Sequence, residues 1–340
     1  MKDIFLTQFS ETRIRDFNDG FKEKTVPIEV RTDRFTGRVS RILPFRLKVP
    51  EPSHPLDRIA EAKKSCPFCP ERIDASTPMF PDDIIPGGRL RHGNSVVIPN
   101  AFPYCSFCGV TIFAPDHYIP MDRLSIDVLT DALEASLKWF DALYAHDPSI
   151  TYYSINWNYM PTAGGSLFHP HFQVVAYPEP TTFQQHLMNE SAAYKRKHGT
   201  HFWPDLIGFE RKTKDRYLFS EGDVAFLASF SPGGIFGEVL VLFRDAASID
   251  EVGDGMWASF LKGLVRTLRC FHRLNLDNLN MTLLLSRTGS PGMWVQARIM
   301  PRIVIPPWGT SDVNYFEKGH DEKVVVFPPE QLAGEIRNTP

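Results

Sequence analysis

A predicted order of secondary structure that occurs twice is the feature that most constrains this chain. In each half, two strand-like runs precede a long amphipathic helix and two more strand-like runs follow it. Apolar side chains mark one face of both predicted helices, at Leu129, Leu133, Leu137, Phe140 and Tyr144 in the first and at Trp257, Phe260, Leu261, Leu264, Leu268 and Phe271 in the second. The repeat predicts an α+β fold made of two copies of one unit, each an antiparallel sheet with a helix, in a pseudo-two-fold arrangement.

Caps and apolar runs give the bounds of the predicted elements. The first helix begins after Ser125, whose hydroxyl is a favourable N-cap. Residues up to about Pro55 predict an extended arm with short strands. We predict an N-terminal domain over residues 1–195 and a degenerate C-terminal domain over residues 196–340. The predicted strands span residues 95–98, 109–113, 151–158 and 174–177 in the first half, and 223–229, 237–243, 280–285 and 293–299 in the second.

Composition narrows the class of protein. Hydrophobic residues make up 43% of the 340 residues and charged residues 23%, which provides material for a sizeable core. The formal net charge of −3 gives no global footprint for nucleic acid or a membrane, although the basic stretch from Arg38 to Lys48 is a candidate for binding phosphate. We find no apolar run of about 18 residues and no apolar segment of the signal-peptide kind, so we expect a cytoplasmic protein.

Two histidines separated by one proline are the first candidates for chemistry. His169 and His171 lie in the run Phe168–Gln173, and Pro170 between them has its φ fixed near −65°. Such a pair alone is weak evidence for catalysis. The preceding run Ala163-Gly164-Gly165-Ser166 strengthens it, because glycines let the backbone approach an anion and the serine adds a donor. We therefore predict a phosphate-binding loop directly before the histidines.

Four of the five cysteines form two Cys-x-x-Cys pairs, which favours metal binding or reduced thiols over a disulfide framework. The most direct interpretation is a zinc ribbon with four cysteines, Cys66, Cys69, Cys105 and Cys108. However, Cys105 follows Cys69 by 36 positions, more than the roughly 15–20 residues typical of a ribbon. The alternative joins the first pair to His117 and His169 and leaves the second pair as buried thiols. Spacing alone does not decide between the two sites.

An ordered set of motifs resembles the galactose-1-phosphate uridylyltransferase family, the transferase branch of the histidine-triad superfamily. The resemblance covers most of the chain, from Thr36-Gly37 to the region around Tyr315. Its motifs are Cys66-x-x-Cys69, Asn100-Ala101-Phe102-Pro103, Ala114-Pro115-Asp116-His117, Asn158, and Gly165-Ser166-x-x-His169-Pro170-His171-x-Gln173.

The resemblance implies the role of the metal and of the nucleophile. Cys66, Cys69, His117 and His169 match the ligands of one structural zinc ion. His171 matches the histidine that attacks the α-phosphorus and becomes a nucleotidyl-histidine, so that the enzyme works by a ping-pong mechanism. We expect the backbone carbonyl of His169 to accept the Nδ1–H of His171, which would leave Nε2 free to attack.

The resemblance also implies the surroundings of the nucleophile. Ser166 and Gln173 match residues that hold phosphate oxygens, and Asn100 matches a nucleoside contact. Asn158 matches a polar residue of the same pocket, and Arg46 matches an arginine that reaches phosphate in the neighbouring subunit of a homodimer. The implied partners are a nucleotide sugar and a sugar phosphate or inorganic phosphate, with neither nucleic acid nor a membrane involved.

The sequence departs from the family at three places. Phe172 stands where the transferases usually have a small residue, so we expect its ring either to crowd the phosphate pocket or to change how the chain approaches it. Gln296 and Arg298 occupy, in the second half, the places of His169 and His171, from which we predict no second metal. In the C-terminal segment that would recognise the hexose, Tyr315 or the shifted Lys318 replaces a lysine, and Asp321 is the candidate for the sugar-binding carboxylate.

These departures leave several functions open. The principal hypothesis is a nucleotidyltransferase of the hexose-1-phosphate uridylyltransferase kind, in galactose or other carbohydrate metabolism. The first alternative is a phosphorylase or hydrolase that acts on a nucleotide sugar or dinucleotide through the same histidine. An alternative of another class is a non-catalytic binding protein stabilised by a four-cysteine zinc site. The sequence assigns neither the base, nor the sugar, nor the acceptor.

Overall fold

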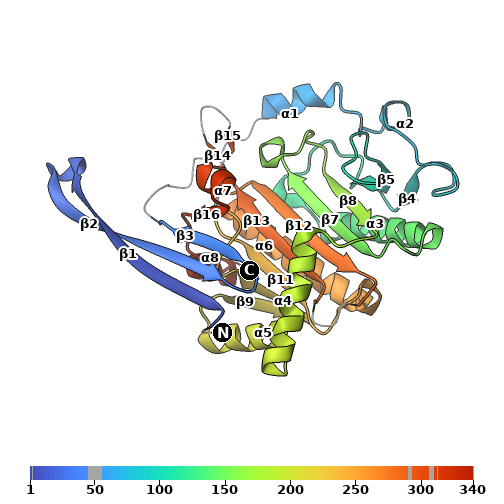
Figure 1. The fold of residues 1–340 in the computed structure, drawn as a ribbon. Coiled ribbons are helices and arrows are strands. Elements are labelled where there is room, and N and C mark those ends of the chain that lie inside the picture. Colours follow the sequence, from blue (N-terminus) through green and yellow to red (C-terminus); the bar gives the residue numbers. More distant parts are fainter. Residues whose placement is uncertain (2, 45–55, 290–292, 306–309, 312, 340) are drawn as a thin grey trace.

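The predicted duplication is confirmed by one large sheet with internal symmetry. A computed structural model describes residues 1, 3–44, 56–289, 293–305, 310–311 and 313–339 of the chain. Ten strands form an antiparallel sheet in the order β4-β5-β6-β8-β7-β12-β13-β11-β10-β9 (Figure 1). The strands are β4 Leu90–His92, β5 Ser95–Pro99, β6 Phe107–Ile112, β7 Tyr152–Tyr159, β8 His171–Tyr177, β9 Tyr217–Glu221, β10 Val224–Ala228, β11 Val239–Phe243, β12 Asn278–Ser286 and β13 Gln296–Arg302.

The pairing of β7 with β12 joins the two halves at the centre of the sheet. On each side of this pair the same order of strands follows outward, and one long helix connects the corresponding strands. These helices are α3, Ile126–His146, and α6, Asp254–Arg273. The hydroxyl of Ser125 accepts the N–H of Val128 at 3.3 Å and caps α3, as predicted from the sequence.

Successive side chains along a strand point to opposite faces of the sheet, and one of these faces packs against α3 and α6. Phe172 and Val174 of β8 join the large core under α3 and α6, whereas His171 and Gln173 point to the opposite face. The expectation that Phe172 crowds the phosphate pocket is therefore wrong. Its ring is 2% exposed and lies 4.4 Å from Phe113, centroid to centroid, inside the core.

On the opposite face of the sheet, different segments of the chain pack against the first and the second half. In the second half, α4 (Thr182–His198) and α5 (Phe202–Thr213) lie across it (Figure 1). A second core forms there between residues of α5, including Trp203 and Leu206, and side chains of β10 and β11 such as Leu227 and Leu240. In the first half, the segment of Cys66 and Phe68 lies over Ile98 and Val110 instead.

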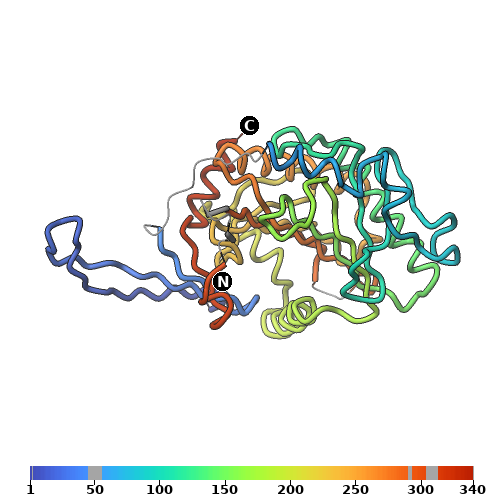
Figure 2. Tube along the Cα trace, turned by 90° about the horizontal axis from the view of Figure 1, so that it is seen from above, coloured from blue at the N-terminus to red at the C-terminus, as the bar shows by residue number. Residues whose placement is uncertain are grey.

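The N-terminal arm is a long hairpin. β1 (Phe5–Asp16) and β2 (Lys22–Asp33) are twelve residues each, so the predicted short strands are wrong. β3 (Arg38–Ile42) and β16 (Glu322–Val325) complete a four-stranded sheet at its base, and the rest of the hairpin extends away from the body (Figures 1 and 2). The length comes from pairing of β1 and β2 along all twelve positions.

The remaining elements are short. In the described part of the chain they are the helices α1 Leu56–Lys63, α2 Ile73–Ser76, α7 Tyr315–Gly319 and α8 Pro329–Arg337, the strands β14 Val304–Ile305 and β15 Thr310–Ser311, and four single 3₁₀ turns. Within the described residues, no helix has the length and apolar character needed to cross a membrane. The division of the chain at residue 195 stays a prediction, and this position falls inside α4.

Candidate functional site

Four buried side chains form a cluster that can hold one metal ion. The ligand atoms of Cys66, Cys69, His117 and His169 all lie within 4.8 Å of one another. The Sγ of Cys69 is 3.5 Å from Nδ1 of His117 and 3.9 Å from Nδ1 of His169, and the Sγ of Cys66 is 3.7 Å from the latter. A tetrahedral zinc ion with ordinary bond lengths separates a sulfur from a nitrogen ligand by about 3.6 Å. The donor set therefore fits zinc.

Local structure orients these ligands. The two cysteines lie in the turn between α1 and α2, where the N–H of Cys69 donates to the carbonyl of Cys66 at 3.4 Å. His169 directly precedes β8, and its Nε2–H donates to the carbonyl of Ala114 at 2.8 Å. That hydrogen bond assigns the proton to Nε2 and leaves Nδ1 as the metal ligand. Burial first, and then the neighbouring Cys66, raise the pKa of the Cys69 thiol to about 11, so a thiolate here needs a cation beside it.

The second cysteine pair lies elsewhere, so the four-cysteine ribbon is wrong. Within the described residues, the Cys66 cluster is the one group of metal-ligand type, and neither Cys105 nor Cys108 belongs to it. Cys108 pairs with Val175 in the sheet, four positions along β8 from His171, a distance of roughly 13 Å. The Sγ atoms of Cys105 and Cys108 are 2.7 Å apart. Cys270 is a buried core residue of α6.

His171 begins β8 and is only 5% exposed. Its Nδ1–H donates to the backbone carbonyl of His169 at 2.7 Å, which is the hydrogen bond expected from the sequence. Within the described residues its Nε2 makes no hydrogen bond, and the ring lines a cavity of about 570 Å³. Burial lowers the pKa of His171, which favours a neutral imidazole with a lone pair on Nε2.

This first cavity contains most of the polar residues singled out in the sequence. Asn100, Ser166 and Gln173 line it together with His171. Phe102 and Tyr104, from the loop between β5 and β6, also line it, and they are 85% and 72% exposed. The hydroxyl of Tyr104 donates to Oε1 of Gln173 at 3.1 Å, so the amide nitrogen of Gln173 is free to donate elsewhere.

The glycine-containing loop supports one wall of this cavity. Gly164 has a φ of +97°, in the left-handed region. A Cβ on Gly165 would lie 3.0 Å from the carbonyl oxygen of Asn158, tighter than ordinary side-chain contacts, so this close approach favours glycine. Asn158 is itself held by a hydrogen bond of 2.7 Å from Nδ2 of Asn280. The loop thereby carries Ser166 into the cavity wall.

A second cavity of about 470 Å³ adjoins the first, and Gln173 lines both. We call it the polar cavity. Asn156, Asn158, Asn280 and Thr282 line it from the central strands, and the charged residues around it are Arg38, Arg302, Glu317 and Lys323. Sequence reasoning missed Glu317 and Lys323, because nothing in the local pattern distinguishes them from surface residues. Arg38 is the first residue of the basic stretch that was a phosphate candidate.

One predicted residue falls outside these cavities, and another cannot be compared with them. Asp321 is exposed in the turn before β16, with a φ of +54°, and lines neither cavity. The carboxylate that the polar cavity contains is Glu317 of α7, whose Oε2 lies 3.5 Å from Nζ of Lys323. Arg46 lies outside the described residues.

The second half has a counterpart of the first cavity. In the first half Ile98, Val110 and Gln173 are neighbours across β5, β6 and β8; in the second half Leu227, Leu240 and Arg298 are neighbours across β10, β11 and β13. The two-residue turns of the β4-β5 and β9-β10 hairpins, after His92 and after Glu221, place Ile98 and Leu227 at the same position of the two halves. Counted from these turns, Arg298 is the counterpart of Gln173 and Gln296 that of His171, two residues away from the correspondence expected from the sequence.

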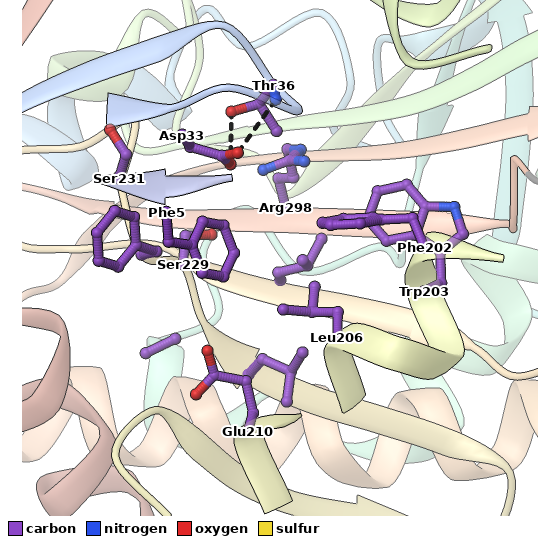
Figure 3. A pocket seen from close by; sticks show the side chains of 14 residues that line it. Phe5, Asp33, Thr36, Phe202, Trp203, Leu206, Glu210, Ser229, Ser231 and Arg298 are labelled. Atoms are coloured by element: carbon purple, nitrogen blue, oxygen red, sulfur yellow. Dashed lines mark hydrogen bonds between the residues drawn. The ribbon is translucent and has the colours of Figure 1, made fainter. Parts of the chain in front are cut away.

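The space over this second row is almost filled. Phe202, Trp203 and Leu206 of α5, with Phe5 of β1, surround Arg298 (Figure 3), and a cavity of only about 20 Å³ is left. Asp33 lies beside the guanidinium and accepts the Thr36 hydroxyl at 2.7 Å.

No family model matches the chain. An uncharacterised protein of Archaeoglobus fulgidus is 28% identical over 320 residues, 94% of either chain.

Solved structures resemble it over nearly its whole length. An ADP-glucose phosphorylase from Arabidopsis thaliana with bound ADP-glucose has a TM-score of 0.72 and 21% identity over 92% of this chain and 99% of that one. A GalT-like protein from Arabidopsis thaliana has a TM-score of 0.70 and 22% identity with the same coverage. A uridylyltransferase has a TM-score of 0.64 and 20% identity over 91% of this chain and 97% of its own. The chain therefore has the same fold as these three proteins.

Proposed function

We propose that this protein is a nucleotidyltransferase that acts on nucleotide sugars and passes the nucleotidyl group through His171. One observation carries the proposal. The hydrogen bond from Nδ1 of His171 to the carbonyl of His169 leaves Nε2 without a partner among the described residues, on a ring that lines a nucleotide-sized cavity. A neutral imidazole held in this way is a competent nucleophile and a competent leaving group.

The reaction would consist of two displacements. In the first, the lone pair of Nε2 forms a bond to the α-phosphorus, and the bond from that phosphorus to the bridging oxygen breaks, so that a sugar phosphate leaves with the electron pair. In the second, an oxygen of the acceptor attacks the same phosphorus and the P–N bond breaks, which returns the electron pair to Nε2. The carbonyl of His169 holds the Nδ1 proton throughout.

Donors around His171 would stabilise the charge that develops on the phosphoryl oxygens. Ser166 offers a hydroxyl, and Gln173 offers the amide N–H groups that its contact with Tyr104 leaves unused. Asn100, Phe102 and Tyr104 lie on the nucleoside side in this proposal, where the exposed rings would stack on the base.

Cys66, Cys69, His117 and His169 would hold one zinc ion, and such a closed site supplies a structural cross-link to the nucleophile segment. His169 is the connection between the two parts of the site. Its side chain belongs to the metal cluster and its carbonyl accepts from His171. The metal cluster would thus preserve the direction of the nucleophile without contact with substrate.

The donor class that we propose is a nucleotide sugar, and the acceptor is a hexose 1-phosphate or inorganic phosphate. The names of the structural relatives, a uridylyltransferase and an ADP-glucose phosphorylase, support this class and both reactions. Phosphorolysis is the second candidate, and the cationic polar cavity beside Gln173 supports either reaction, since both acceptors carry a phosphate. A cytoplasmic homodimer stays a prediction.

Mass spectrometry of the intact protein tests the proposal. The zinc-loaded protein is incubated with UDP-, ADP- and GDP-sugars in the absence of an acceptor. We expect a mass gain of one nucleoside monophosphate with at least one donor, and none in His171→Asn. An adduct that persists in His171→Asn would contradict the assigned nucleophile, and binding of donors with neither adduct nor turnover would favour the non-catalytic alternative.

A further inference from the structure

Arg38 stands at the wall of the polar cavity in an unusual environment for a surface arginine. Its side chain is 22% exposed, and its Nη1 donates to Oε2 of Glu238 at 2.5 Å. Within the described part of the chain, Glu238 is the one hydrogen-bond partner of this guanidinium. The other N–H groups of the planar fork therefore remain available for an anion.

Glu238 has no exposed surface and lies directly before β11. Its Oε2 also accepts the N–H of Gly233 at 2.8 Å, and its Oε1 accepts the Ser229 hydroxyl at 2.8 Å and the guanidinium of Arg298. Both carboxylate oxygens thus have two donors each. A carboxylate so completely satisfied is fixed in place, and it fixes in turn what it binds.

The arginines share a second neighbour. The ring of Phe183, in α4, lies 5.1 Å from the Arg38 guanidinium carbon and 5.3 Å from that of Arg298. Glu238 and Phe183 therefore hold Arg38 from two sides, while Gly233 carries the same restraint into the cavity wall. This arrangement gives Arg38 one orientation, as a preformed anion site requires.

The charge around the cavity fits a phosphorylated ligand. Arg38, Arg302 and Lys323 contribute three positive charges to the cavity lining against one lining carboxylate, Glu317. The Glu238 carboxylate behind Arg38 is also paired with Arg298 and does not line the cavity. The neutral amides and hydroxyl of Asn156, Asn158, Asn280 and Thr282 supply further polar groups of the kind that bind sugar hydroxyls. Because Gln173 lines both cavities, a phosphate in the polar cavity lies next to the site of nucleotidyl transfer.

We propose that Arg38 binds the phosphate group of the acceptor in the polar cavity and that buried Glu238 positions Arg38 for this task. The inference rests on the proposed function for the identity of the ligand as an acceptor, but not for the binding of phosphate itself. Its substrate class is a phosphate monoester or inorganic phosphate.

Titration calorimetry with inorganic phosphate tests Arg38 without any turnover. The full-length, zinc-loaded protein is titrated at low ionic strength. We expect Arg38→Gln to weaken phosphate binding about 10- to 100-fold, the range for loss of a charge-assisted contact. Arg38→Lys keeps the charge but loses the fork, so it should recover part of the affinity. The matched control is Arg41→Gln, on the same strand and paired with Glu322 outside the cavity.

The variant Glu238→Gln distinguishes two effects of Glu238 on anion binding, its orientation of Arg38 and its negative charge. Loss of a negative charge beside Arg38 would by itself tighten anion binding, whereas loss of positioning weakens it. We expect weaker binding, and a higher KM for the acceptor with a smaller change in kcat. Ser229→Ala, which removes one donor to the carboxylate, should show a smaller change in the same direction even if Glu238→Gln does not fold.

The outcomes distinguish this inference from the proposed function. Phosphate binding that is absent in the unsubstituted protein, or unchanged in Arg38→Gln, overturns the anion site even if the His171 adduct forms. Tighter or unchanged binding in Glu238→Gln and Ser229→Ala overturns the positioning role of Glu238. Loss of the adduct reaction with phosphate binding intact overturns the proposed function and leaves the anion site standing.

Discussion

The two halves of the large sheet have rows of side chains at corresponding positions, but different segments of the chain pack over these rows. In the first half the row Ile98, Val110 and Gln173 borders a cavity of about 570 Å³. In the second half the corresponding row ends in Arg298, and a cavity of about 20 Å³ remains above it. The backbone pairing is equivalent, so the difference comes from what lies on top of the sheet.

In the second half that cover is α5, whose aromatic residues Phe202 and Trp203 are at most 2% exposed. In the first half it is the turn of the metal cluster, which contributes Phe68 and leaves Phe102 and Tyr104 at the cavity wall. Duplication therefore explains the shared arrangement of strands and helices. Whether a half has an open cavity depends on the segment that packs over this face of its sheet. The halves also differ in their buried polar centres. One half has the Cys66, Cys69, His117 and His169 cluster, which can hold a metal ion, and the other has the Glu238 ion cluster.

The largest expected effect tests whether chemistry belongs to one half. His171→Asn should reduce the rate of adduct formation by a factor of roughly 10⁴ or more, since loss of a nucleophile removes the covalent route. Its counterpart Gln296→Asn should leave that rate within about threefold. The measurement is the time course of the nucleotide adduct by mass spectrometry. Equal losses in both variants would contradict the assignment of catalysis to the first half.

Zinc content and stability should depend on the cluster of Cys66, Cys69, His117 and His169 and should not depend on Cys105 and Cys108. Cys69→Ser should abolish stoichiometric zinc, measured by elemental analysis, and lower the free energy of unfolding by several kcal/mol, because metal-binding energy is folding energy. Cys105→Ser combined with Cys108→Ser is the control and should keep one zinc ion per chain. Loss of zinc in that control would restore the four-cysteine site.

The aromatic residue over the second-half row should serve stability, whereas the one over the first-half row should serve binding of the nucleotide donor. Trp203→Ala should destabilise the protein by about 3–5 kcal/mol in urea unfolding, because it leaves a cavity in a filled space, and should leave donor binding unchanged. Phe102→Ala should change stability by less than about 0.5 kcal/mol. Loss of its stacking should raise the KM for the nucleotide donor roughly 5- to 100-fold. A stability loss in Phe102→Ala without a change in KM would show that this ring is merely packed.

Much of the candidate site could be predicted from sequence because its residues lie in compact motifs. The segment from Ser166 to Gln173 carries the proposed phosphate donor, metal ligand and nucleophile together, and Cys66-x-x-Cys69 supplies the other half of the cluster that can hold a metal ion. The position of Phe172 was also predictable from strand alternation: if His171 and Gln173 face the cavity, the residue between them faces the core.

The polar cavity could not be predicted in this way. Its charged residues come from β3, β13, α7 and β16, segments that only the tertiary fold brings together. The partner of Arg38 is Glu238, 200 positions away, and no local pattern identifies either residue. The filled counterpart in the second half was also missed, because α5 has an ordinary amphipathic pattern that does not reveal which face of the sheet it covers.

The smallest effect concerns the acid response of the ion cluster in the second half. Burial alone would raise the pKa of Glu238, but the charges of Arg38 and Arg298 and the N–H of Gly233 lower it to about 2. A lowered pKa stabilises the fold above the unfolded value of 4.5, and this stabilisation is lost as the pH falls from about 4.5 to 2. The full loss corresponds to about 3 kcal/mol.

Comparison of the unsubstituted protein with Glu238→Gln isolates this contribution. Acid also protonates the ligands of the metal cluster, and burial raises the pKa of Asp33 in the opposite sense, but both proteins share these groups. The difference between their free energies of unfolding in urea should therefore be constant above about pH 5 and shrink toward pH 2. A difference that stays constant over this range would mean that Glu238 is not held as an anion. The second half would then keep its buried centre by packing of α5 alone.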